Sequence, residues 1–209
     1  MGSIGACTSR APGPSATVTV TATQPVVSAI TSRSASPTPS VTSPPRIVTR
    51  LAGTCDTLLP LSAVEHAVGR LLPGKTAFVV GVPEKDIGRL AYLNCRYGIP
   101  VPSSGQPVTP GIEIGISLYG SASQAQHRLA NTITDYVGHG ATQSSFTISG
   151  HDAELLLGAT SPGYDIPLLV VASGQRSVAV SIASAIAPAA SRRGVMTALA
   201  ALALARTGG

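Results

Sequence analysis

Cys7 is the residue whose neighbours indicate the most specific chemistry in this sequence. It follows Ile4-Gly5-Ala6, so an aliphatic residue stands three positions before the cysteine and small residues lie between them. Signal peptidases that process lipoproteins cleave before a cysteine in this setting, and the thiol then carries a diacylglycerol group. Two or more acyl chains give stable membrane anchoring, whereas a single chain is marginal. The sequence therefore predicts lipidation at Cys7.

An unmodified Cys7 is the alternative. A signal peptide needs a basic segment and an apolar segment of about 7–15 residues before the cleavage site, and only Met1–Ala6 precede Cys7 here. The lipid anchor therefore requires a natural start codon further upstream. Myristoylation at Gly2 is disfavoured because Ala6 stands where that signal has Ser or Thr.

Cys55 and Cys95 are the two other cysteines. In an exported protein an even pair of this kind forms a disulfide, whereas in the cytosol both would remain reduced thiols. A bridge would close a loop of about 40 residues, for which the chain-entropy model gives a stabilisation of about 4 kcal/mol. Spacing alone does not decide between these two states.

The four histidines suggest no catalytic or metal site. His66 and His127 fall on the polar sides of expected helices, and His139 and His151 flank a turn with Asp152 close by. The sequence has no H-E-x-x-H or C-x-x-C motif, no G-x-S-x-G and no phosphate-binding loop. We therefore predict no catalytic residue, no metal and no cofactor. The alternative is a cell-envelope hydrolase that uses His139, His151 and nearby carboxylates.

The composition divides the chain into three parts. Of the 38 residues from Thr8 to Pro45, 23 are Thr, Ser or Pro, and such a segment buries too little apolar surface to offset its ordering entropy. We predict an anchor segment over 1–7, a disordered linker over 8–50 that is a candidate for O-glycosylation, and a single domain over 51–209.

The charge of +5 lies mostly in the linker, because residues 1–50 contain four arginines and no acid. The domain carries ten Lys or Arg against nine Asp or Glu and has no basic stripe with aromatic residues, so nucleic acid is excluded as a partner. No run of about 18 apolar residues is present to span a bilayer.

Apolar periodicity predicts an α+β fold with the order α-β-β-β-α-β-β-β-β-α. Short connections between consecutive strands favour a mostly antiparallel sheet with helices packed on it. Ser62 and Glu65 are expected to form a capping box for the first helix, which would end at Pro73-Gly74. The expected helices span about 61–72, 122–137 and 191–206, and the expected strands span 76–82, 91–98, 112–119, 145–149, 153–158, 167–172 and 175–184.

The segments "CDTLLPLSAVEHAVG" and "LNCRYG" resemble small cell-envelope lipoproteins of mycobacteria and other actinobacteria. They also resemble the extracellular sensor domains of some mycobacterial Ser/Thr kinases. The resemblance covers about residues 51–98 by motif and the rest by element order. It implies an antiparallel α+β domain, lipidation at Cys7 and a bridge between Cys55 and Cys95, and it brings no catalytic residues.

The function we expect is that of a non-enzymatic lipoprotein on the outer face of the plasma membrane. It would bind a lipid, a glycan or an envelope protein within reach of its linker. The competing interpretations are the hydrolase and a cytosolic domain with three free thiols.

Overall fold

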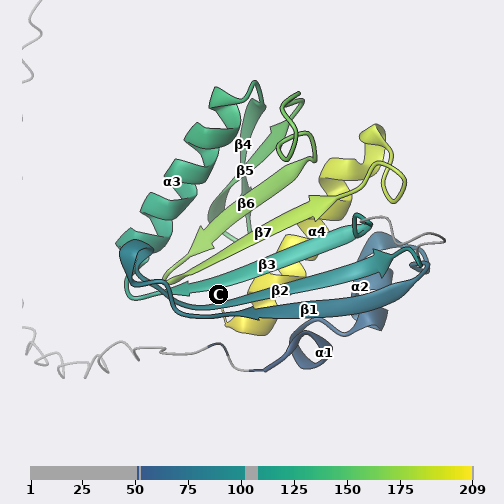
Figure 1. The fold of residues 1–209 in the computed structure, drawn as a ribbon, viewed down its shortest axis with the longest axis horizontal. Coiled ribbons are helices and arrows are strands. Elements are labelled where there is room, and N and C mark those ends of the chain that lie inside the picture. The colour runs from purple at the N-terminus through teal and green to yellow at the C-terminus, as the bar shows by residue number, and fades with distance from the viewer. Residues whose placement is uncertain (1–50, 52, 102–107, 209) are drawn as a thin grey trace, which may run out of the picture. The chain divides into compact units, whose positions relative to one another are not determined.

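The computed structural model describes residues 51, 53–101 and 108–208. Over these residues the chain forms a seven-stranded antiparallel sheet with helices packed on it, which confirms the predicted fold class (Figure 1). Cys7 and the linker 8–50 lie outside the described residues. None of the described helices is long and apolar enough to cross a bilayer.

The seven strands and the helices α2, α3 and α4 follow one another in the predicted order, and the short helices α1 and η1 were not predicted. The helices are α1 Cys55–Leu58, α2 Leu61–Val68, η1 Lys85–Ile87 (a short 3-10 helix), α3 Ala122–Gly138 and α4 Ala189–Thr207. The strands are β1 Lys75–Gly81, β2 Arg89–Ile99, β3 Ile112–Tyr119, β4 Thr142–Ile148, β5 His151–Leu157, β6 Leu168–Ser173 and β7 Arg176–Ile182.

The spatial order of the strands is β1-β2-β3-β7-β6-β5-β4, and every neighbouring pair is antiparallel. Two meanders, β1 to β3 and β4 to β7, are therefore joined side by side through β3 and β7. This join pairs Ile114 with Val180 and Gly115 with Ala179. Because the partners are far apart in sequence, strand alternation could not reveal this pairing.

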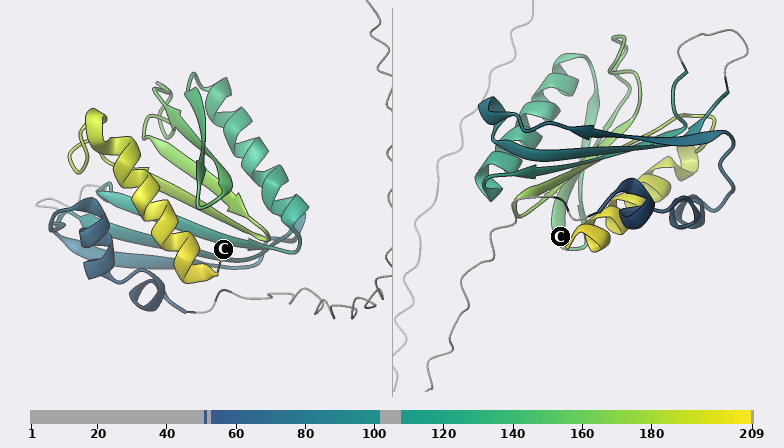
Figure 2. Two further views of the ribbon diagram at one scale, coloured as in Figure 1. Left: turned by 180° about the vertical axis from the view of Figure 1, so that it is seen from behind. Right: turned by 60° about the horizontal axis from the view of Figure 1, so that its bottom comes forward.

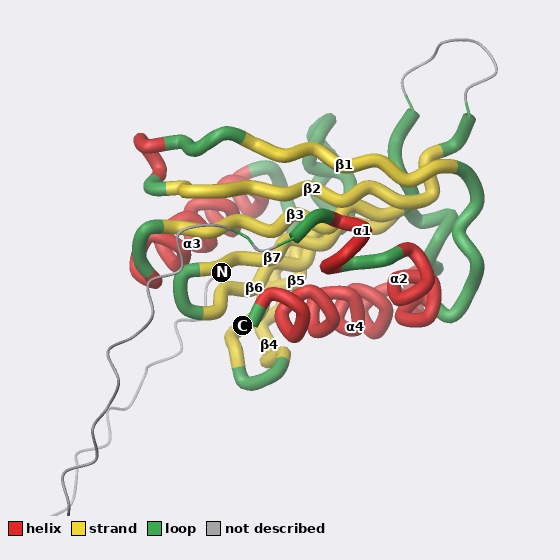
Figure 3. Tube along the Cα trace, turned by 90° about the horizontal axis from the view of Figure 1, so that it is seen from below, coloured by secondary structure: helices red, strands yellow, loops and turns green. Residues whose placement is uncertain are grey.

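One face of the sheet is sealed by α1, α2 and α4, and we call it the α4 face. In Figure 1 helix α4 passes behind the strands, and from behind it crosses in front of them (Figure 2, left). Helix α2 packs beside α4 (Figure 3). The central strands bury aliphatic residues and Cys95 on this face, among them Leu93, Ile114, Ile116, Val178 and Val180. On the same side of the edge strand β1, Phe78 and Val80 are 49% and 67% exposed.

The opposite face, the α3 face, is covered only in part. Leu129 of α3 packs with Leu156, Val170 and Ala172 of β5 and β6 in a small apolar cluster. Helix α3 also contacts β3 and β7, but over β1 and β2 no described helix lies on this side, as Figure 1 shows. Strand β2 is therefore covered by helices on the α4 face only.

The segment before the first long strands is tied to the sheet at two points. Cys55 of α1 and Cys95 of β2 form a disulfide with a Cα–Cα distance of 5.6 Å. The Tyr97 hydroxyl donates a hydrogen bond of 2.5 Å to the Leu59 carbonyl. Burial, and to a lesser extent the charge of Asp56, raises the pKa of Tyr97 well above its ordinary value, so its hydroxyl stays a donor.

The start and end of α2 differ from the prediction. Pro60 is the N-cap residue, so Ser62 lies inside the helix and the expected capping box is wrong. Glu65 instead accepts a hydrogen bond of 2.9 Å from the Leu72 amide. The helix ends at Gly69, whose φ of 76° is left-handed, and glycine adopts this conformation without a steric penalty.

Candidate ligand-binding groove

Three rows of side chains cross the open part of the α3 face. Read from β2 through β3 to β7, they are Arg96–Glu113–Ser181, Asn94–Gly115–Ala179 and Tyr92–Ser117–Ser177. Gly115 and Ala179 stand next to each other in the middle row, so the sheet is hollowed there. A Cβ atom on Gly115 would lie 3.4 Å from Cε2 and Oη of Tyr92, which shows that the Tyr92 ring leans across this hollow.

Two cavities adjoin over this floor, and together we call them the groove. The first has a volume of about 240 Å³ and lies between Tyr92, Asn94 and Tyr136 of α3. The second has a volume of about 250 Å³ and lies beside Arg96 and Pro110. The two share Glu113, Ile166 and Ser181. Each is slightly below the usual size of a pocket for a small ligand, and the pair reaches it.

The wall formed by the β5–β6 connection is fixed to the C-terminal end of α3. The Tyr164 hydroxyl donates a hydrogen bond of 2.9 Å to Oδ2 of Asp135, and this bond raises the pKa of Tyr164. The His139 ring stacks on the Tyr164 ring at a centroid distance of 3.8 Å, and Tyr136 meets Tyr164 edge-on at 5.0 Å. These contacts preorganise the side of the groove opposite β2.

The charged side chains of the groove pair with each other. Nε of Arg96 lies 3.0 Å from Oε1 of Glu113 across β2 and β3. Just outside, Arg89 pairs with Glu84 and lies 4.7 Å from the centroid of the Tyr92 ring. Burial first, and the charge of Glu113 second, raise the pKa of Tyr92, so it stays a neutral phenol. The groove is therefore polar but carries no net charge.

Asn94 is the residue that most clearly indicates a ligand. It is only 7% exposed and lines the first cavity. The part of the chain that the structure describes offers no hydrogen-bond partner to its side chain, nor to that of Ser117. The amide atoms of Asn94 are not themselves buried, so the amide is open to solvent inside the cavity and can exchange water for a polar group of a bound molecule.

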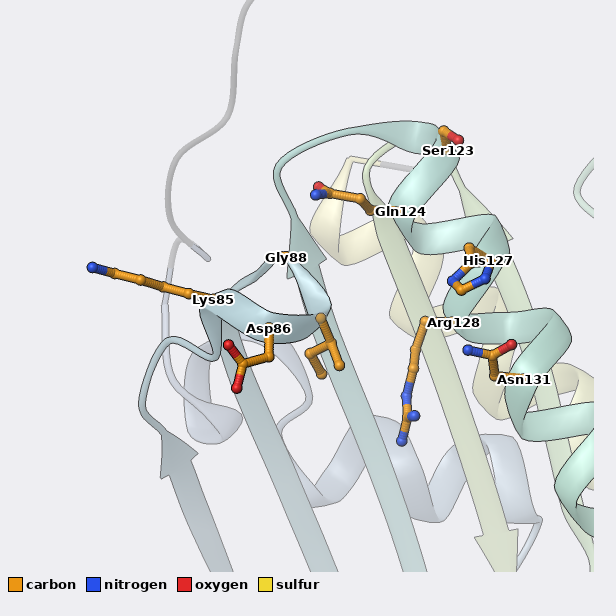
Figure 4. Close-up of a pocket in the computed structure, with 9 residues that line it drawn as sticks. Lys85, Asp86, Gly88, Ser123, Gln124, His127, Arg128 and Asn131 are labelled. Carbon is orange, nitrogen blue, oxygen red and sulfur yellow. The ribbon is translucent and has the colours of Figure 1, made fainter.

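A larger hollow lies between η1 and the first turns of α3 (Figure 4). Its volume is about 410 Å³, but exposed side chains such as Lys85, His127 and Arg128 line it. Lys85 points away from α3 (Figure 4), and the N-terminus of α3 is already capped by Ser121, which accepts from the Gln124 amide at 3.1 Å. We favour the groove because its floor is held by paired strands.

The histidines that the sequence singled out lie apart from one another. His139 packs against Tyr164 beside α3. His151 begins β5 on the α4 side, where its Nε2 is 3.1 Å from the hydroxyl of Ser173. The sheet separates the two, so they do not form one site. His66 and His127 are exposed. Among the described residues no group of three His, Cys, Asp or Glu could hold a metal ion.

The sequence did not single out the groove residues. Alternation along β3 correctly separated Glu113, Gly115 and Ser117 from the apolar side of the strand, and small or polar residues on one side of a central strand are a usable signal. The polar loop 100–111 lies beside the groove, and its Pro- and Gly-rich sequence is typical of an ordinary surface loop as well as of a contact surface. Its residues 102–107 lie outside the described part, and Val108, Thr109 and Pro110 line the second cavity.

The chain was compared with protein-family models, curated proteins and solved structures. No family model matches the chain, and no curated protein matches it. Among solved structures, the extracellular domain of PknH from Mycobacterium tuberculosis is similar with a TM-score of 0.44 and 10% sequence identity, over 78% of this chain and 100% of that one. The function must therefore be argued from the site itself.

Proposed function

We propose that this chain is an extracytoplasmic binding module, anchored to the membrane through Cys7, that holds a ligand in the groove and catalyses no reaction. The observation that carries the binding proposal is Asn94. Its side chain lines a cavity and makes no hydrogen bond to a described group, and its amide atoms are open to the solvent in the groove although the residue as a whole is only 7% exposed. The groove also has a fixed floor and a wall held by the Tyr164–Asp135 hydrogen bond.

Two features support the extracytoplasmic location. The Cys55–Cys95 disulfide is a bond that persists in oxidising compartments and is rare in the cytosol. The sequence around Cys7 fits a lipoprotein cleavage site, and the Ser/Thr/Pro-rich segment after it has the composition of a tether. The layout matches that of the actinobacterial envelope lipoproteins that the sequence resembles.

The hydrolase alternative has less support. It needs His139 and His151 to act together, and these residues lie on opposite faces of the sheet. The groove itself contains one carboxylate, Glu113, which is paired with Arg96 at 3.0 Å. A paired carboxylate next to neutral amide and hydroxyl groups is arranged to bind a molecule rather than to transfer a proton.

Retention of small molecules tests the binding proposal. The wild type, Asn94→Ala and the control Ser144→Ala, which alters an exposed residue of β4, are immobilised and exposed to soluble envelope extract. Molecules released by denaturation are identified by mass spectrometry. We expect the wild type and Ser144→Ala to retain the same species and Asn94→Ala to lose it. Equal retention by all three proteins contradicts the proposal.

The anchor is tested on protein isolated from its native membrane. The N-terminal tryptic peptide should begin at Cys7, end at Arg10 and carry the mass of the acyl groups. A peptide that contains Ala6 joined to an unmodified Cys7 contradicts lipidation and leaves the groove proposal unaffected.

A further inference from the structure

We propose that the ligand of the groove is a neutral oligosaccharide. This inference rests on the proposed function, because it names the chemical class that the same site would take. It depends on three properties of the groove: its charge, the types of its uncharged polar groups and the placement of its aromatic rings.

The charge distribution favours a neutral ligand over an ionic one. Arg96 and Glu113 are the charged residues of the two cavities, and they pair with each other at 3.0 Å. A phosphate or carboxylate would have to compete with Glu113 for Arg96, and a cation would have to compete with Arg96 for Glu113. A neutral ligand leaves this pair intact and can accept from, or donate to, its outer atoms.

The uncharged polar groups fit a ligand rich in hydroxyls. The amide of Asn94 offers a donor and an acceptor side by side, and the hydroxyls of Ser181 and Tyr92 can each do both. Neighbouring hydroxyls of a sugar ring present the same mixture of donors and acceptors. An acyl chain would leave these groups without partners, and leaving them so is unfavourable, so a lipid tail is a poor occupant.

Two phenol rings border the same cavity. Tyr92 leans over Gly115 from β2, and Tyr136 comes from α3. The faces of aromatic rings carry a partial negative charge. A sugar ring can present a flat set of C–H groups, which carry a weak positive charge, to such a face. A saccharide can therefore place its apolar face on a phenol ring and its hydroxyls on Asn94 and Ser181.

The position of the groove disfavours a peptide. Its floor consists of β2, β3 and β7, and each of these strands is paired on both sides. Peptides that bind sheets gain most of their affinity by adding a strand to a free edge. The edge strands of this sheet are β1 and β4, and neither belongs to the floor of the groove. The shared residues Glu113, Ile166 and Ser181 make the two cavities continuous, which suits more than one linked sugar residue.

Calorimetry on the full chain tests this inference with defined probes. The panel contains neutral hexasaccharides of different linkages (α- and β-glucans, a mannan, a galactan and an arabinan), a sulfated heparin hexasaccharide and dihexanoylphosphatidylcholine. We expect at least one neutral hexasaccharide to bind and the sulfated sugar and the lipid not to bind. Asn94→Ala should weaken binding at least tenfold, and Ser144→Ala should leave it unchanged.

A second variant separates the lost amide from the shape of the groove. Gly115→Ala adds a methyl group that meets Tyr92 at 3.4 Å and Cβ of Ala179 at 3.8 Å, which are ordinary contact distances. It narrows the hollow and removes no polar group, so it should also weaken binding while the melting temperature of the unliganded protein stays close to that of the wild type. Sugar binding that both variants retain overturns the inference.

The two proposals can fail separately. If no neutral sugar binds at millimolar concentration and envelope extract still yields a species that Asn94→Ala cannot retain, the sugar assignment is wrong and the groove remains the binding site. If Asn94→Ala retains the extract species as well as the wild type does, the groove itself is wrong and the sugar inference falls with it.

Discussion

The two faces of β2 and β3 are built from alternate residues of the same strands, and they differ in burial and in polarity. On the α4 face Cys95 and Ile116 are fully buried among aliphatic side chains and helices. On the α3 face their neighbours Asn94 and Gly115 line an open cavity. The comparison teaches that one face can supply the stability of the domain and leave the other free to carry polar groups that packing alone would not favour.

Removal of the disulfide, which lies on the α4 face, should cause the largest loss of stability. Replacing Cys55 and Cys95 together by Ala opens a loop that spans 40 residues and should lower the free energy of unfolding by about 4 kcal/mol. Urea denaturation measures this change, and reduction of the wild type with dithiothreitol is the control that should reproduce it. An unchanged urea midpoint would show that the bridge does not stabilise this face.

Two substitutions one strand apart sharpen the comparison. Ile116→Ala leaves a cavity on the α4 face, where Ile116 is fully buried, and should cost about 2–5 kcal/mol. Asn94→Ala removes an unpartnered amide on the α3 face and should change the unfolding free energy by less than about 0.5 kcal/mol. Similar losses for both variants, measured by urea denaturation, would mean that the α3 face is also structural.

The hydrogen bond from Tyr97 to Leu59 makes a smaller contribution to the free energy of unfolding, also on the α4 face. Tyr97→Phe should lower the unfolding free energy by about 1 kcal/mol near neutral pH. Denaturation at a series of pH values measures this loss together with its pH dependence.

The sign of that pH dependence follows from the raised pKa of Tyr97. An unfolded tyrosine ionises near pH 10 while the folded one stays protonated, so the contribution is constant below about pH 10 and is lost as the pH rises above it. The Phe variant should lose less stability above pH 10 than the wild type. Tyr92 and Tyr136 also have raised pKa values, so part of the alkaline loss remains. Parallel pH profiles for the two proteins would contradict this assignment.

The smallest effect is expected at the wall of the groove. Tyr164→Phe keeps the stacking with His139 and removes the hydrogen bond to Asp135. The unfolding free energy should not change measurably, and ligand affinity should fall less than it does in Asn94→Ala. An affinity loss equal to that of Asn94→Ala would place Tyr164 in direct contact with the ligand.

Periodicity in the sequence was sufficient for the order of the strands and the three longer helices, and it missed the short helices α1 and η1. The signal was clear where one side of an element is apolar, as in β3, and weak in β4, whose sequence TQSSFTI is mostly polar. It placed Ile112, Ile114 and Ile116 on one face of a strand, and the structure buries all three. It was wrong about the end of α2, where Gly69 stops the helix before the expected Pro73-Gly74. Leu71, which falls inside the helix expected over 61–72, lies beyond the end of α2 for this reason and is 80% exposed.

The groove could not be predicted because it depends on contacts between distant segments. The sheet is hollowed at Gly115 because Ala179 of β7 lies beside it. Tyr136 closes the cavity because α3 packs across β5, β6, β7 and part of β3 and leaves β2 open. Alternation shows which residues of a strand share a face. It does not show which strand lies next to it or how far a helix covers it.

Amide chemical-shift mapping of the full chain with a bound ligand is the most direct test of the central claim, that the open part of the α3 face binds the ligand. The account predicts that the largest shifts cluster at Asn94, Gly115 and Ser181, and that the α4-face residues of the same strands move less. Shifts centred instead on α4 and α2, or spread evenly over the surface, would contradict it.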